Sequence, residues 1–120
     1  MDLKDYLTGY PDIVHGGVQC AILGELAWWA VFEWLKKVGI AKRVELRFLR
    51  AAKASSPLEA KGKIREIKGM DVSVSACIFN EENKVCTKAL VTYYLPERSE
   101  FIKIVGDERI AEAYLSRQEG

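Results

Sequence analysis

Residues 13–35 read IVHGGVQCAILGELAWWAVFEWL and predict a helix that begins at a His-Gly-Gly turn. Between residues 18 and 35, only Gln19, Glu25 and Glu33 interrupt the apolar side chains. A helix on a protein surface normally has an apolar stripe and a polar face. We therefore expect this helix to be buried on all sides, with the rest of the chain arranged around it.

Glu25 is the most unusual residue of this helix. At 100° per residue, its carboxylate shares a face with apolar side chains. These are Val18, Ala21, Ile22, Trp28, Trp29 and Phe32. An unpaired buried carboxylate costs on the order of several kcal/mol. We therefore expect Glu25 either to take part in chemistry or to be satisfied by a buried partner such as Tyr93 or a lysine.

The periodicity changes from helix to strand after residue 41. Lys36 and Lys37 lie in the last helical turn, and Gly39 is the expected C-cap. Alternating apolar and polar residues predict strands at 44–48, 58–65 and 71–78. A fourth run, at 84–94, alternates less cleanly and predicts a strand covered on both faces. Short connections favour an antiparallel meander.

Residues 107–117 have the pattern of a short C-terminal helix. An all-apolar helix and a sheet with one polar face can both be buried only if the sheet curls around the helix. The sequence thus predicts a single domain, residues 1–120, of the α+β class. Its curved antiparallel sheet wraps one long buried helix, and a short helix follows.

Composition excludes several kinds of partner. The 120 residues carry a formal net charge of +1, too little to attract nucleic acid or an anionic membrane. Glu25 and Glu33 make the long helix a poor membrane span. The three cysteines have no CxxC spacing, which favours reduced thiols over a disulfide frame or a metal site. We expect a cytoplasmic protein with no bound metal.

The start of the helix is a candidate site. Unsatisfied amides of the first turn, including those of Gly16 and Gly17, act with the helix dipole to stabilise an oxyanion or a polarised carbonyl. Glycine lets a substrate approach the backbone closely. His15 could orient the turn or contribute to the site directly. The alternative is a plain tight turn with a capping histidine.

Four segments resemble the hotdog-fold acyl-CoA thioesterases of the phenylacetate-pathway type. They are PDIVHGG, VELRFLRAA, PLEAKGKIREIKG and TYYLPERSEF, within roughly residues 9–101. The resemblance implies a hotdog fold, hydrolysis of an acyl- or aryl-CoA thioester, and a site at the interface of a homodimer or a dimer of dimers. Coenzyme A would enter as part of the substrate, with no separate cofactor.

The acid position departs from the family's pattern. Counted from His15, the family's catalytic acid falls on Gly24, and its threonine at the next strand falls on Ala41. The spacing from Glu25 to Ala41 matches the family better, which favours one inserted residue at the helix start and Glu25 as the acid. Gly17 and Glu25 are about 12 Å apart along the axis. One thioester could therefore reach both groups only if they came from two protomers.

The remaining candidates concern substrate binding. Trp28 and Trp29 could line an acyl pocket, although aromatic residues at helical spacing usually form core. Arg65, Lys68 and Gly69 could hold coenzyme A phosphates; the alternative is a solvated sheet edge. Because His15 is the only histidine, a Ser-His-Asp triad has no support. A non-catalytic acyl-CoA binder and a hotdog dehydratase or hydratase using His15 with Glu25 remain alternative functions.

Overall fold

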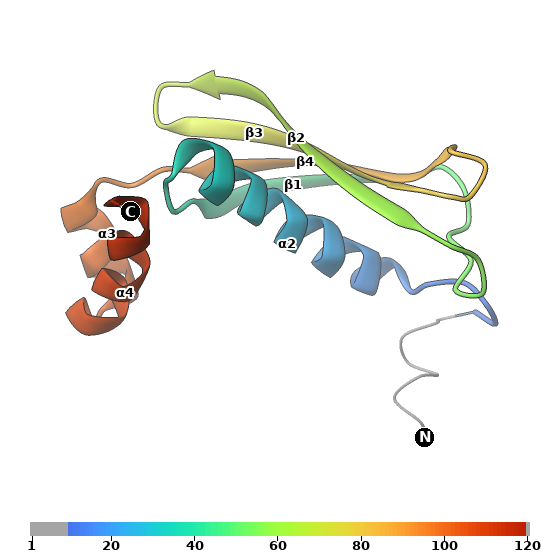
Figure 1. Cartoon of the computed structure of the whole chain (residues 1–120), viewed down its shortest axis with the longest axis horizontal. Coiled ribbons are helices and arrows are strands. Elements are labelled where there is room, and N and C mark those ends of the chain that lie inside the picture. Colours follow the sequence, from blue (N-terminus) through green and yellow to red (C-terminus); the bar gives the residue numbers. More distant parts are fainter. Residues whose placement is uncertain (1–9, 120) are drawn as a thin grey trace.

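The computed structural model describes residues 10–119, with side chains to residue 115. One long helix, α2 (Gly16–Leu35), lies along one face of a four-stranded sheet, and two short helices, α3 (Arg98–Val105) and α4 (Glu108–Glu119), follow at one end (Figure 1). The strands are β1 (Ile40–Phe48), β2 (Glu59–Lys68), β3 (Asp71–Phe79) and β4 (Val85–Tyr94). This confirms the predicted α+β architecture. No helix within the described residues is long and apolar enough to cross a membrane.

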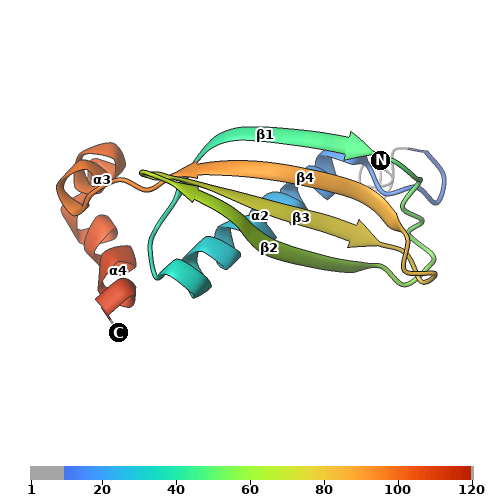
Figure 2. The same cartoon turned by 90° about the horizontal axis from the view of Figure 1, so that it is seen from above.

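The sheet is antiparallel with the order β1-β4-β3-β2, as Figure 2 shows. Strands β2, β3 and β4 form the expected hairpins, but β1 pairs with β4, so a simple meander was wrong for this strand. The segment after β1 carries the chain past the start of α2 to the opposite sheet edge. Its path is fixed by hydrogen bonds from Val14 N to Ala52 O (2.9 Å) and from Ala54 N to Asp12 O (3.0 Å).

The core lies between the sheet and one side of α2. Leu23, Ala27 and Val31 are completely buried there. They face a layer of small apolar side chains from the two central strands. That layer consists of Val72, Val74, Ala76, Ala89 and Val91. Deep burial of this face accounts for the alternation seen along β3, in which every second residue is buried.

The outer side of α2 is not covered. Ile22 is 45% exposed, Trp29 42% and Trp34 78%, and Glu25 is also exposed. Burial of the helix on all sides, and with it a buried Glu25, was therefore wrong for the single chain. The sheet reaches only one side of a helix that is apolar all round.

Two local expectations also need correction. Helix α2 ends at Leu35, and Lys36 is its C-cap in the left-handed conformation at φ 55°, so Lys36 and Lys37 lie after the last helical turn rather than in it. Gly39, the predicted C-cap, lies further on against the side chain of Tyr93. Strand β4 is central but covered on one face only, because Lys88 and Leu90 are exposed on its outer face. Its irregular pattern arises from Cys86 and Thr87, both buried beside a register shift in the β3–β4 pair.

The C-terminal helix was predicted correctly as α4, but α3 was not predicted. Gly106, at φ 78°, ends α3, and the Asp107 carboxylate caps the next helix by accepting from the amides of Arg109 (2.9 Å) and Ile110 (3.2 Å). The α3–α4 hairpin forms a second apolar cluster against the end of α2. Its buried members are Val38, Phe101, Ala111 and Leu115, with Trp28 and Phe32 packed against them.

Candidate active site

His15 is the N-cap of α2. Its Nδ1 accepts a hydrogen bond from the amide of Gly17 (2.9 Å), and its carbonyl accepts from the amide of Gln19 (3.0 Å). His15 was predicted either to orient the turn or to contribute to the site directly. These two hydrogen bonds are those of a residue that orients the turn. The amides of Gly16 and Val18 have no hydrogen-bond acceptor among residues 10–119. They are the unsatisfied donors at the positive end of the helix dipole.

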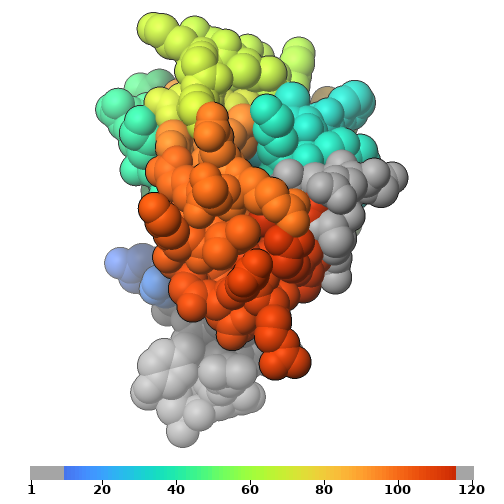
Figure 3. Space-filling view, turned by 90° about the vertical axis from the view of Figure 1, so that its left-hand side faces the viewer, coloured from blue at the N-terminus to red at the C-terminus, as the bar shows by residue number. Residues whose placement is uncertain are grey.

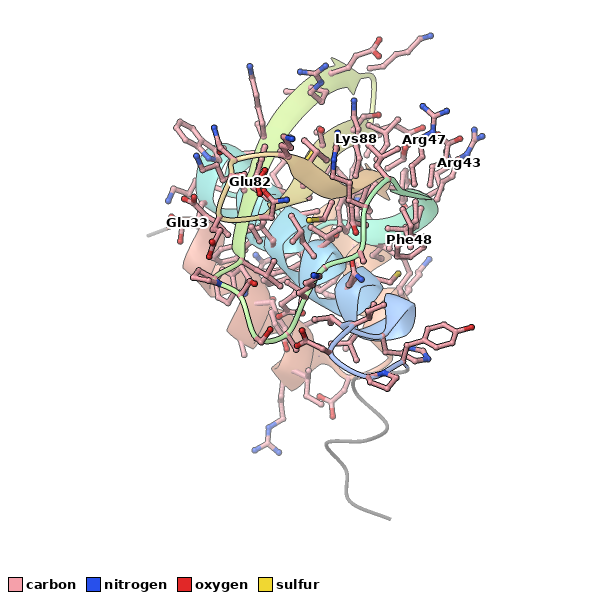
Figure 4. All side chains as sticks on the ribbon, turned by 90° about the vertical axis from the view of Figure 1, so that its right-hand side faces the viewer. Glu33, Arg43, Arg47, Phe48, Glu82 and Lys88 are labelled. Atoms are coloured by element: carbon pink, nitrogen blue, oxygen red, sulfur yellow. The ribbon has the colours of Figure 1, made fainter. Side chains whose placement is uncertain are left out.

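Both glycines of the turn are in close contact with other side chains. A Cβ at Gly16 would lie 3.2 Å from the ring of Phe48, and one at Gly17 would lie 3.1 Å from Nδ1 of His15. The helix start therefore leaves little room for larger residues. In Figure 4, Phe48 lies on the side of the sheet that faces α2, while Arg43 and Arg47 extend from the outer side.

A cleft of about 660 Å³ lies beside the helix start, within the usual size range of small-molecule sites. Its lining joins the start of α2 to the end of β1 and includes Val14, His15, Gly16, Gln19, Phe48 and Arg50. The Arg50 guanidinium donates to the carbonyl of Val85 (2.7 Å), which holds a positive charge at this wall. Sequence reasoning did not identify Phe48 or Arg50, because neither stands out from an ordinary strand end.

A buried polar pair fixes the start of α2 against the sheet. Gln19 and Thr87 are 3% and 0% exposed. The Gln19 amide donates to the carbonyl of Val14 (2.9 Å), and the Thr87 hydroxyl donates to the Gln19 amide oxygen. Since buried polar groups must be paired, these contacts determine where the first-turn amides point. The sequence showed Gln19 only as an interruption of an apolar run.

Glu25 lies halfway along α2 and borders two hollows. One is a shallow groove along the outer side of the helix, with Ile22, Leu26 and Trp29. The other is a cavity of about 490 Å³ beside the end of the helix. The Glu25 carboxylate has no hydrogen bond or ion pair to any other described residue. The predicted neighbours Trp28 and Trp29 do lie with it at this cavity.

Tyr93 lies close to Glu25 without bonding to it. Its hydroxyl donates to the carbonyl of Gly24 (2.8 Å). Burial, and then the negative charge of Glu25, raises the pKa of Tyr93 to about 12. The expected pairing of Tyr93 with a buried Glu25 is therefore replaced by a contact to the helix backbone one residue earlier.

The positions singled out by the family's pattern are close to this contact. Ala41 is paired with Tyr93 across β1 and β4. A Cβ at Gly24 would meet nothing within 4 Å, so the helix has space for a side chain there.

The single chain does not bring all predicted catalytic residues together. His15 and Gly16 line the cleft at the helix start, whereas Glu25 lines the groove and the cavity further along, and these hollows share no residue with the cleft. Because α2 is continuous from Gly16 to Leu35, Gly17 and Glu25 are about 12 Å apart along its axis at the usual helical rise.

The three residues predicted to hold coenzyme A phosphates lie elsewhere. Arg65 is exposed at a bulge of the edge strand β2, and Lys68 and Gly69 follow at the β2–β3 turn. Gly69 adopts φ 62° and lines a separate cavity of about 390 Å³ near Lys37. Within one chain, these residues are therefore not part of the cleft beside His15.

The comparisons with known proteins identify the family. The model of the thioesterase superfamily matches residues 12–87, more than half of the chain. No curated protein matches the sequence significantly.

Several solved structures share the fold. A hypothetical thioesterase of Streptococcus pneumoniae TIGR4, crystallised with coenzyme A, has a TM-score of 0.65 at 21% identity, over 70% of this chain and 67% of that one. The smu.793 protein of Streptococcus mutans UA159, bound to acetyl CoA, has a TM-score of 0.69 at 16% identity, over 77% and 73%. A further thioesterase superfamily protein has a TM-score of 0.68 at 24% identity; the match covers 74% of this chain and only 43% of that longer one. The chain therefore belongs to the thioesterase superfamily and has its hotdog fold.

Proposed function

We propose that the protein is a thioesterase that hydrolyses an acyl- or aryl-CoA thioester, as a homodimer or a dimer of dimers. The observation that carries this proposal is the first turn of α2. Its Gly16 and Val18 amides lack acceptors among the described residues, and Gly16 borders a cleft large enough for a substrate. Membership of the thioesterase superfamily and two similar structures that contain coenzyme A or acetyl CoA support it.

In this proposal the helix start polarises the thioester carbonyl. Backbone amides and the helix dipole stabilise the negative charge that develops on the carbonyl oxygen. His15 accepts from Gly17 and so holds the turn in place. In one route, Glu25 of the other protomer takes a proton from a water molecule whose oxygen attacks the carbonyl carbon. The C–S bond then breaks, and the proton passes to the sulfur of the departing coenzyme A. In the other route, Glu25 itself attacks the carbonyl carbon, the thiolate of coenzyme A leaves and takes a proton from solvent, and water then hydrolyses the acyl anhydride formed on Glu25.

Two surfaces that the single chain leaves open support the proposed two-protomer arrangement. The outer side of α2 exposes Ile22 and Trp29, an apolar patch typical of an interface. Strand β2 beside it is an unpaired sheet edge whose residues are mostly exposed. Gly62 of β2 lies against Leu26 of α2, since a Cβ added at Gly62 would lie only 3.3 Å from Leu26 Cγ. A second copy that covers both surfaces would bring its own helix start towards Glu25.

Substrate binding is proposed from the residues that surround these two positions. Trp28 and Trp29 beside Glu25 would accept the acyl or aryl group. Arg50 in the cleft offers a fixed cation for the coenzyme A part of the substrate. Arg65, Lys68 and Gly69 would reach phosphates across the subunit interface. The phenylacetate-pathway type is the finer proposal for the kind of substrate.

A thiol-release assay on the purified full chain tests the function. Acetyl-, hexanoyl-, benzoyl- and palmitoyl-CoA are supplied in turn, and free coenzyme A is measured with a thiol reagent. We expect turnover with at least one substrate, and loss of this turnover in Glu25→Gln. Glu33→Gln is the matched control, because Glu33 is another exposed acid of the same helix but lines neither the groove nor the cavity.

A non-catalytic acyl-CoA binder is the second candidate. It is favoured by the two positions where the family's pattern has an acid and a threonine and this chain has Gly24 and Ala41. Saturable acyl-CoA binding without thiol release would support it and overturn hydrolysis. A hydratase using His15 with Glu25 has less support, since the His15 ring already accepts from Gly17.

A further inference from the structure

The cavity beside Glu25 has walls of aromatic rings. It is about 490 Å³ in volume, and its lining includes Glu25, Trp28, Trp29, Phe101 and Tyr114. Trp28 and Trp29 meet edge to face, with ring centroids 5.2 Å apart, and Trp28 stacks on Phe32 at 5.4 Å. Phe101 and Tyr114 also meet edge to face, at 6.5 Å. These contacts restrict the rings, so the cavity has flat and rather rigid sides.

Two of these rings come from the α3–α4 hairpin. The family model matches residues 12–87, so the hairpin lies outside the matched part of the chain. In Figure 3, which faces this end of the molecule, the hairpin (orange to red) lies against the region at the end of α2 (cyan). Phe101 belongs to α3 and Tyr114 to α4, and both line the cavity together with Glu25, Trp28 and Trp29 of α2.

Apolar packing, a hydrogen bond and an ion pair hold the α3–α4 hairpin in this position. Phe101 is 5% exposed and packs in the second apolar cluster with Val38 and Leu115. The Tyr94 hydroxyl donates to the Glu100 carboxylate (2.6 Å), which ties α3 to the end of β4. Arg98 and Glu112 form an ion pair between the two helices. These contacts therefore fix the position of the cavity wall that the hairpin provides.

We infer that the α3–α4 hairpin closes the far end of the acyl pocket and that Phe101 and Tyr114 set the length of the acyl group. The inference rests on the proposed function, since Glu25 at the edge of the cavity would place the thioester there. Aromatic walls around a cavity of about 490 Å³ fit an aryl or medium-length acyl group, which buries its apolar surface against the rings. A long acyl chain would meet the hairpin.

The test compares Tyr114→Ala with Ile110→Ala. Tyr114 is 40% exposed, so its removal opens the wall at modest risk to the fold. Ile110 is 52% exposed on the same helix and does not line the cavity, which makes it the matched control. The ratio of kcat/KM for palmitoyl-CoA over hexanoyl-CoA is measured for each. We expect Tyr114→Ala to raise this ratio about tenfold, the gain from burying roughly two more methylene groups, and Ile110→Ala to leave it unchanged.

A binding measurement separates this inference from the proposed function. Dissociation constants are measured for the non-hydrolysable thioethers S-hexyl- and S-hexadecyl-CoA. Hydrolysis with unchanged ratios in Tyr114→Ala would overturn the inference and leave the function standing. No hydrolysis, together with a tenfold shift in the ratio of dissociation constants, would support the pocket and overturn the hydrolysis.

A second variant guards against a folding defect in Tyr114→Ala. Tyr114→Trp adds volume at a partly exposed position and should shift the preference towards shorter acyl groups. A ratio that stays constant in this variant, with a native circular dichroism spectrum, would overturn the inference.

Discussion

The hydroxyl of Tyr93 donates to the carbonyl of Gly24 at 2.8 Å and so joins the middle of α2 to β4, one of the two central strands of the sheet. The contact lies one residue before Glu25, whose charge contributes to the raised pKa of Tyr93. Gly39 leaves space for the Tyr93 ring, since a Cβ added at Gly39 would lie 3.1 Å from Tyr93 Cδ1. Tyr93 thus fixes the position of α2 along its axis, and its rotation about that axis, next to the residue expected to be the catalytic acid.

The first prediction concerns Tyr93 and alkaline pH. Its pKa is about 12 in the folded chain against a normal value of 10.0, so the unfolded chain loses this proton first. The protonated phenol therefore favours the folded state below about pH 10, and this contribution is lost as the pH rises from 10 to 12. We expect Tyr93→Phe to unfold with a weaker pH dependence than the wild type across this range, measured by urea denaturation at fixed pH values.

At neutral pH the same variant tests the hydrogen bond. Loss of the Tyr93 hydroxyl leaves the Gly24 carbonyl with its helical partner only, and the free energy of unfolding should fall by about 1 kcal/mol. Tyr114→Phe is the control, because the Tyr114 ring is 40% exposed. If Tyr93→Phe and the wild type lost equal stability between pH 10 and pH 12, the raised pKa would not belong to Tyr93.

The second prediction concerns Glu25. If it is the base or nucleophile, Glu25→Gln should lower acyl-CoA turnover by at least ~100-fold, the low end of a general base's contribution. Because Glu25 is exposed in the single chain, its replacement should change the free energy of unfolding by less than about 0.5 kcal/mol. Thiol release and thermal melting are measured together, and unchanged turnover would remove Glu25 from the mechanism.

Periodicity predicted the secondary structure well and the surroundings of α2 poorly. The helix at 18–35 and the alternating strands were readable because helix and strand periods differ. The exposure of Glu25 could not be predicted from periodicity. An all-apolar helix has the same sequence pattern whether its outer side is covered by its own sheet or by another protomer. The pairing of β1 with β4 was missed because loop length does not specify which edge a strand joins.

The site was predictable in parts for a similar reason. The His15-Gly16-Gly17 turn could be recognised because capping is local in sequence. Gln19 and Thr87 are 68 residues apart, and nothing in either local sequence indicates that they bond. Helix α3 was missed because the run RSEFIKIV is only eight residues long and is separated from β4 by only three residues.

The third prediction concerns self-association. The outer side of α2 exposes Ile22, which we expect to be covered by a second protomer. If the proposed dimer or tetramer forms through this surface, Ile22→Lys should yield monomers and abolish turnover, because the helix start of one protomer would no longer lie near Glu25 of the other. Light scattering at micromolar concentration measures this, with Ile104→Lys on α3 as the control at 53% exposure. A wild-type protein that is monomeric and active would contradict the proposal that the site is formed by two protomers.

The fourth prediction concerns the turn. Gly17→Val should damage turnover more than stability. A Cβ at this position would lie 3.1 Å from Nδ1 of His15, so the imidazole must move and the cap that orients the first-turn amides is disturbed. The backbone of Gly17 is helical and accepts a side chain without positive-φ strain. Full turnover in this variant, or complete unfolding, would count against the oxyanion role.

The last prediction decides between the two possible positions of the acid. By direct count from His15 the family's acid falls on Gly24, and a Cβ there meets nothing within 4 Å, so a glutamate can be accommodated. Replacing a glycine inside a helix also stabilises it, by roughly 0.5–1 kcal/mol. The double variant Gly24→Glu with Glu25→Gln therefore moves the carboxylate by one residue, or 100° around α2, in a chain that stays folded. If Glu25 already occupies the catalytic position, the moved carboxylate points elsewhere, and the double variant should remain as inactive as Glu25→Gln alone. Thiol release that appears in the double variant but is absent from the wild type would instead show that the catalytic position is that of Gly24 and that the natural sequence lacks the acid, which would favour the acyl-CoA binder.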